Sequence, residues 1–169
     1  MNDDWPRAIE FVLKMEGGET AENDPNDPGG LTKFGISQKA YPALDIKNLT
    51  LDQAKDIYRR DYWQACECDG LPTPFAIAVF DTAVNQGVNK AKRLLQIALD
   101  VNVDGIIGPK TITAAFKAEP YRVKKFLAER LAEYARLMAG NQNLLVFAVG
   151  WSYRVISLAQ LVLGPATIA

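Results

Sequence analysis

Carboxylates are the side chains of this sequence best able to do acid–base chemistry, because its 169 residues include no histidine. That absence excludes Ser-His-Asp and Cys-His nucleophile systems and zinc sites built on imidazole. The only cysteines, Cys66 and Cys68, are too few for a structural zinc site and poorly spaced for a mutual disulfide, so we expect free thiols of a reducing compartment. We expect no metal and no cofactor. Paired carboxylates cleave glycosidic bonds well, which favours a glycoside hydrolase.

Glu16 stands where such an enzyme needs a general acid. Trp5, Ala8 and Val12 recur at helical spacing, which predicts an amphipathic helix over residues 5–16. Glu16 follows Val12 by one turn and therefore continues the apolar side of that helix. Burial there disfavours the charged carboxylate and lets it keep the proton that a general acid donates. The alternative is a helix end at which Glu16 simply turns out to solvent.

The length and composition suit one compact domain or a domain with a small helical appendage. Apolar residues make up 49% and charged residues 23%, the formal net charge is −1, and nothing favours a nucleic-acid partner. Helical signals dominate, and short strands have room only between residues 17 and 39. The predicted helices cover residues 5–16, 50–63, 73–87, 89–100, a segment beginning at Gly108-Pro109, 120–140 and 144–163.

Three of these helix starts rest on capping residues. Thr50 and Gln53 have the spacing of a capping box. Thr73 precedes a proline and is predicted to cap the next helix, and Asn89 the one after it.

Several groups of residues recur in the order and spacing of one known family. They are Glu16-Gly17-Gly18, the loop Asp24-Pro25-Asn26-Asp27-Pro28-Gly29-Gly30-Leu31-Thr32 with Gly35-Ile36, Tyr58 to Trp63, Phe80 to Gly87, and Val103 to Thr111. Over roughly residues 5 to 140 the chain resembles glycoside hydrolase family 108, muramidases of phage endolysins and bacterial secretion-activating proteins. A fainter match follows at Gly150-Trp151 and Arg154.

This resemblance implies a lysozyme-like, all-α fold with at most a short hairpin after the first helix. It implies hydrolysis of peptidoglycan between N-acetylmuramic acid and N-acetylglucosamine, with Glu16 as the catalytic acid. Asp27 is our first choice for the assisting carboxylate and Asp24 the second, with Thr32 helping to hold water. Both aspartates precede prolines and are alternatively turn-formers, and Thr32 is alternatively a plain loop hydroxyl. Glu19 replaces the family's usual aromatic residue, which removes one expected sugar contact.

Candidate sugar contacts come from an amide and three aromatic side chains. Asn85 lies one helical turn after Asp81, and we expect Asn85 to contact the sugar and Asp81 to hold structure. Tyr62, Trp63 and Trp151 are candidates for stacking on sugar rings, although each is alternatively a core residue.

Residues 1–88 form the predicted catalytic region, and residues 89–169 a helical region that resembles a peptidoglycan-binding module, packed into the same globular unit.

One segment of the second region resembles a calcium loop. Asp100, Asn102 and Asp104 match the first half of such a loop, but Thr111 replaces its bidentate Glu. We therefore interpret this segment as a structural turn.

The apolar stretch 144–163 is long enough to span a bilayer, yet Arg154 near its middle makes a packed helix the better interpretation. We expect a monomer without stable membrane insertion, although this helix suits a partner helix as well as its own core. The acidic N-terminus lacks the pattern of a signal peptide. We expect synthesis in the cytoplasm and access to the wall by holin-type release or dedicated export.

Two other functions fit the same residues. A lytic transglycosylase also needs one glutamate but no group that positions water. A non-catalytic wall-binding or secretion-accessory protein would leave Glu16 without a chemical role.

Overall fold

A computed structural model describes residues 4–16 and 30–164 of the chain. The helices and strands are, in order, α1 (Trp5–Glu16), β1 (Thr32–Lys33), β2 (Ile36–Ser37), α2 (Leu51–Tyr58), the π-helical turn η1 (Arg59–Gln64), the 3₁₀ turn η2 (Cys68–Gly70), α3 (Thr73–Gln86), α4 (Val88–Leu99), α5 (Pro109–Phe116), α6 (Tyr121–Gly140), the 3₁₀ segment η3 (Gln142–Phe147) and α7 (Ala148–Leu163). The expected helical fold class is confirmed, with one two-stranded antiparallel hairpin in the described part.

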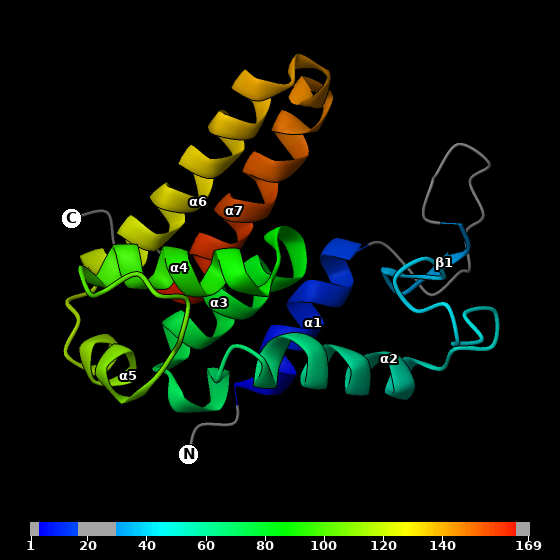
Figure 1. The fold of residues 1–169 in the computed structure, drawn as a ribbon, viewed down its shortest axis with the longest axis horizontal. Helices are drawn as coiled ribbons and strands as arrows, with labels where there is room; N and C mark the ends of the chain where they lie inside the picture. Colours follow the sequence, from blue (N-terminus) through cyan, green and yellow to red (C-terminus); the bar gives the residue numbers. More distant parts are fainter. Residues whose placement is uncertain (1–3, 17–29, 165–169) are drawn as a thin grey trace.

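Helix α3 is the centre of the fold, with α1, α4, α6 and α7 packed around it (Figure 1). Its residues from Phe75 to Ala83 are all buried, because neighbours cover every side of this mostly apolar helix. Phe80 joins an aromatic cluster with Trp5 and Trp63, whose ring centroids lie 5.4 Å and 5.5 Å from its own. This cluster ties α1 and η1 to α3.

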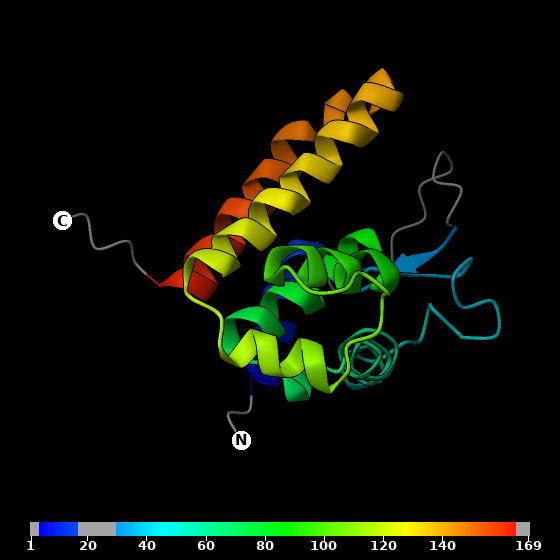
Figure 2. The same cartoon turned by 60° about the vertical axis from the view of Figure 1, so that its left-hand side comes forward.

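Helices α6 and α7 form an antiparallel arm, connected at its far end by η3, that projects from the body in both views (Figures 1 and 2). Within the described residues, the helical segment Gln142–Leu163 has the length and mean hydropathy (1.5) of a membrane span. Only 17% of its most apolar window is buried, so most of this surface faces solvent.

Of the three predicted helix caps, one is present and two are not. The capping box is present: Thr50 N donates to Gln53 Oε1 at 2.9 Å, and Gln53 N donates to Thr50 Oγ1 at 3.3 Å. Thr73, however, is already helical, because Pro72 supplies the extended residue before α3. Asn89 lies inside α4, whose cap is Gly87 with φ 91°, so the prediction for Asn89 was wrong as well.

The segment that resembles a calcium loop is engaged in local bonds. Asp104 Oδ1 accepts hydrogen bonds from Gln96 Nε2 at 2.7 Å and from Ile106 N at 2.8 Å. Asp100 pairs with Arg122 and, at 2.5 Å, with Lys125 of α6. These bonds favour a structural turn that anchors α6 to the end of α4.

Candidate active site

Glu16 is the last residue of α1, and its side chain is paired with an arginine from the other end of the sequence. Arg154 Nη1, on α7, donates to Glu16 Oε1 at 2.7 Å. The Glu16 side chain is 23% exposed and that of Arg154 only 8%. The carboxylate is therefore sheltered, as its place on the helix predicted, but it also has a cationic partner that the sequence analysis did not assign.

Asp81 binds the guanidinium of Arg154 that also contacts Glu16. Arg154 Nε donates to Asp81 Oδ1 at 2.9 Å, and Arg130 Nη1, from α6, donates to Asp81 Oδ2 at 2.5 Å. The side chains of Asp81 and Arg130 are fully buried. One carboxylate thus joins three helices, α3, α6 and α7, which confirms the structural role predicted for Asp81.

Arg154 carries a permanent positive charge in this arrangement. Burial by itself lowers the pKa of its guanidinium. The charges and hydrogen bonds of Asp81 and Glu16 have the opposite and larger effect, so the pKa of Arg154 lies well above its usual range. Glu16 therefore faces a fixed cation at every pH at which the protein is folded.

The network continues along the arm. Arg130 Nη2 lies 3.2 Å from Tyr134 Oη, and the Tyr134 hydroxyl donates to Asn85 Oδ1. Asn85 is one turn beyond Asp81 on α3, so this amide lies about 5–6 Å farther along the same helix face. Asn85 is only half-buried, and it remains a candidate sugar contact.

The hairpin packs on the other side of Glu16. Its two-residue turn, Phe34 and Gly35, has positive φ at both positions (53° and 76°), as a type I′ turn requires. A Cβ at Gly35 would lie 2.6 Å from Tyr58 Oη and 2.9 Å from Glu16 Cβ. Only glycine allows this turn to approach the acid so closely.

Tyr58 locks that turn in place. Its hydroxyl donates to the carbonyl oxygen of Phe34 at 2.9 Å. Burial, followed by the charge of Glu16, raises the pKa of Tyr58 well above its usual range. The phenol therefore stays protonated and keeps donating, which offsets the strain of a non-glycine residue with positive φ.

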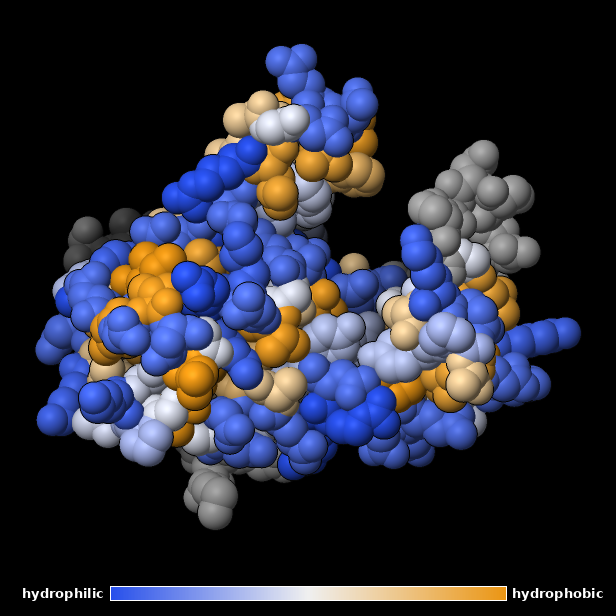
Figure 3. Space-filling model, in the orientation of Figure 1, coloured by the Kyte–Doolittle hydropathy of each residue, from blue (hydrophilic) through white to orange (hydrophobic). Residues whose placement is uncertain are grey.

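These contacts place Glu16 between the arm and the hairpin. Figure 1 shows that α1 ends between these two parts, and Figure 3 shows the surface hollowed there. Arg154 comes from the arm side and Gly35 from the hairpin side.

The other residues predicted for catalysis are placed only in part. Thr32 is half-buried on β1, and its hydroxyl lies 3.4 Å from the carbonyl oxygen of Gly30. Asp24 and Asp27 lie outside the described residues. The choice of the assisting carboxylate therefore stays a prediction.

The three aromatic candidates differ in exposure. Trp63 is 1% exposed, and its indole N–H donates to Asp69 Oδ1 at 2.7 Å, so its burial contradicts the predicted sugar contact and makes it a core residue. Tyr62 is half-buried beside Tyr58, with ring centroids 5.7 Å apart. Trp151, also half-buried, has its ring stacked on Tyr134 at 4.5 Å.

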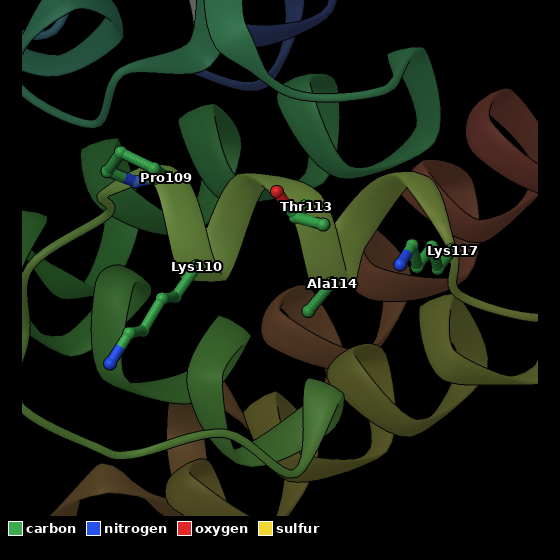
Figure 4. A pocket seen from close by; sticks show the side chains of 5 residues that line it. All are labelled: Pro109, Lys110, Thr113, Ala114 and Lys117. Atoms are coloured by element: carbon green, nitrogen blue, oxygen red, sulfur yellow. The ribbon is translucent and has the colours of Figure 1, made fainter.

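Asn85 and Trp151 share a pocket of about 350 Å³ where the arm leaves the body. Its other lining residues are Gln86, Lys90, Glu133, Tyr134 and Leu137. A further pocket of about 470 Å³, over α5, is lined by Pro109, Lys110, Thr113, Ala114 and Lys117 (Figure 4). That lining has no carboxyl group and offers no general acid.

Arg154, Arg130 and Tyr58 are site residues that sequence reasoning missed. The signal for Arg154 was an isolated charge inside the apolar stretch 144–163, since a buried charge needs a partner of opposite sign. Its partner could not be read from the sequence, because Glu16 lies far away along the chain.

Comparison with known proteins identifies the family of the chain. Residues 9–87 match the model of the family described as glycosyl hydrolase 108, and residues 86–156 match a predicted peptidoglycan domain. The chain belongs to glycoside hydrolase family 108. It is similar to the solved structure of Brucella abortus SagA, with 31% identity, a TM-score of 0.79, and coverage of 98% of this chain and 97% of that one. No curated protein matches the sequence.

Replacing Asp81 by Asn tests the buried network. The change leaves two buried guanidinium groups without their shared counter-charge, so the free energy of unfolding should fall by about 3–5 kcal/mol in urea denaturation. Asp56→Asn is the matched control, because Asp56 is exposed on α2, and it should change stability by less than about 0.5 kcal/mol. Equal effects of the two variants would contradict the role given to Asp81.

Replacing Gly35 by Ala tests the contact between hairpin and acid. Gly87→Ala is the control, since Gly87 also has positive φ (91°) but nothing within 4 Å of an added Cβ. Gly87→Ala should lose about 1–2 kcal/mol of stability from backbone strain, and Gly35→Ala should lose more because its Cβ also collides with Tyr58 and Glu16, as measured by thermal denaturation. Only Gly35→Ala should also lose most of its activity on purified cell walls. Normal activity of Gly35→Ala would show that the turn does not position Glu16.

Proposed function

We propose that this protein is an N-acetylmuramidase that hydrolyses peptidoglycan strands between N-acetylmuramic acid and N-acetylglucosamine. The observation that carries the proposal is Glu16, a sheltered carboxyl group between the arm and the hairpin, fixed by Arg154 and packed against Gly35. Membership of a glycoside hydrolase family and the predicted peptidoglycan domain support the same substrate.

Glu16 is the general acid of the proposed reaction. Arg154 engages Oε1, and no described residue hydrogen-bonds Oε2, so Oε2 is the oxygen that would present the proton to the glycosidic oxygen. As the proton leaves, negative charge develops on Glu16. The adjacent guanidinium stabilises that charge and therefore assists bond cleavage.

The second half of the reaction needs a group that steadies the positively charged sugar or positions water. We assign this role to Asp27 first and Asp24 second, with Thr32 assisting, on the family resemblance. The half-buried amide of Asn85, beside the network, is our candidate for binding acetamido or hydroxyl groups of the glycan. The protein would act on the wall as a lytic enzyme, after holin-type release or dedicated export from the cytoplasm.

Glu16→Gln should reduce the clearing of purified cell walls by at least about 100-fold, because an amide keeps the bond to Arg154 but cannot donate the proton. Its melting temperature should stay close to that of the wild type. Glu10→Gln, an exposed change on the opposite face of α1, is the matched control and should clear walls normally. Sedimentation of Glu16→Gln with walls should be retained, since binding does not need the acid.

Two outcomes would redirect the assignment. Unchanged clearing by Glu16→Gln would leave a wall-binding protein in which this carboxylate has no catalytic role. Anhydro-muramic ends, in mass spectra of peptidoglycan digested by the wild type, would identify a lytic transglycosylase; a hydrolase leaves ordinary reducing ends.

The assisting carboxylate can be assigned by measuring the clearing of purified cell walls by Asp27→Ala and by Asp24→Ala at equal protein concentration. We expect the loss of clearing activity to be at least about tenfold greater for Asp27→Ala, which removes the group nearer Thr32 in sequence. A larger loss in Asp24→Ala reverses the assignment, and normal activity of both variants excludes the two residues together.

A further inference from the structure

The face of α7 that points away from the body is apolar and exposed. Val149 is 81% exposed, Tyr153 65% and Ile156 59%. Helices of a folded domain normally bury such side chains, and contiguous exposed apolar surface marks a place of interaction. Figure 3 shows apolar residues gathered toward the end of the arm.

The spacing of this face is that of a helix–helix seam. Val149, Tyr153, Ile156, Gln160 and Leu163 are all exposed and follow one another at intervals of four, three, four and three residues. This is the spacing that lets two helices pack along a common line, and a single polar residue within such a seam sets its register. A second helix therefore fits this face, which we call the α7 seam.

Charge distinguishes a helix from a lipid surface as the occupant. Helices that lie on bilayers carry Lys and Arg beside their apolar side. The only charged residue of α7 is Arg154, which is buried and bound to Asp81 and Glu16. A bilayer-spanning position is equally unfavourable, because it would draw Arg154 out of both ion pairs.

The exposed area fits a small dimer. Beyond the α7 seam, Leu145, Val146 and Phe147 of η3 are each more than half exposed. Seven such side chains, each with about 60–120 Å² of apolar area, present about 400–850 Å². Each partner in a standard interface contributes roughly 800 Å².

We propose that a second copy of this chain covers the α7 seam, so that the protein forms a symmetric dimer through its arms. A twofold axis makes the interface self-complementary, and no charge within the α7 seam opposes its own image. Ile156 is the middle residue of the α7 seam. In a parallel or an antiparallel pair, Ile156 of one copy therefore lies against Ile156 of the other. The opposite face of α7 holds Glu16 through Arg154, so the dimer fixes the helix that positions the acid. The proposed dimer differs from the monomer expected from the sequence.

Light scattering over a concentration series tests the dimer. The wild type should have twice the mass of the 18.6 kDa chain at tens of micromolar, and its melting temperature should rise with concentration. Ile156→Glu brings two carboxylates together and should give a monomer with unchanged circular dichroism. Ile106→Glu, at a 68% exposed site outside the arm, should leave the dimer intact.

Cross-linking gives an independent readout that does not depend on the stability of a charged variant. Ile156→Cys should form an intermolecular disulfide rapidly under mild oxidation, while Ile106→Cys should not; the native thiols are buried. A wild type that is monomeric throughout, or a dimer that Ile156→Glu leaves intact, overturns the proposal. Binding of the monomer to vesicles of phosphatidylglycerol would assign the surface to lipid instead.

Discussion

The buried carboxylate of Asp81, shared by Arg130 and Arg154, is the interaction on which the site depends. A single charge on α3 holds α6 and α7 together, and Arg154 then extends to Glu16 on α1. Removing two guanidinium groups and a carboxylate from water is costly, and only their mutual attraction and hydrogen bonds compensate. The geometry of the acid is therefore inseparable from the packing of the arm.

Helix α7 has one face that packs against the protein and one face that is exposed. One face carries Arg154, Val155 and Leu158 into the protein. The other carries the α7 seam, which has no partner within the chain's described part. The apolar character of this helix thus fits packing against the body on one face and the proposed dimer contact on the other, and the charge that argues against membrane insertion is the charge that the site uses.

The hairpin shows how local sequence and tertiary contact combine. Positive φ at Phe34 and Gly35 makes the two-residue turn, and the missing side chain of Gly35 leaves room for Glu16 and Tyr58. These contacts explain why the family motif has glycine at this position, since the backbone of an alanine would be strained and its Cβ would collide with Glu16. Tyr58 contributes the hydrogen bond that holds the strained turn.

The sequence by itself determined most helices, the hairpin and the placement of Glu16, because helical periodicity, turn residues and the capping box at Thr50 are local properties. It failed where the answer depended on neighbours: Trp63 lies in the core, and Thr73 and Asn89 do not cap. Only the tertiary structure decided which group faces Glu16. The physical reason is that an ion pair between α1 and α7 depends on three-dimensional packing, which no spacing along the chain encodes.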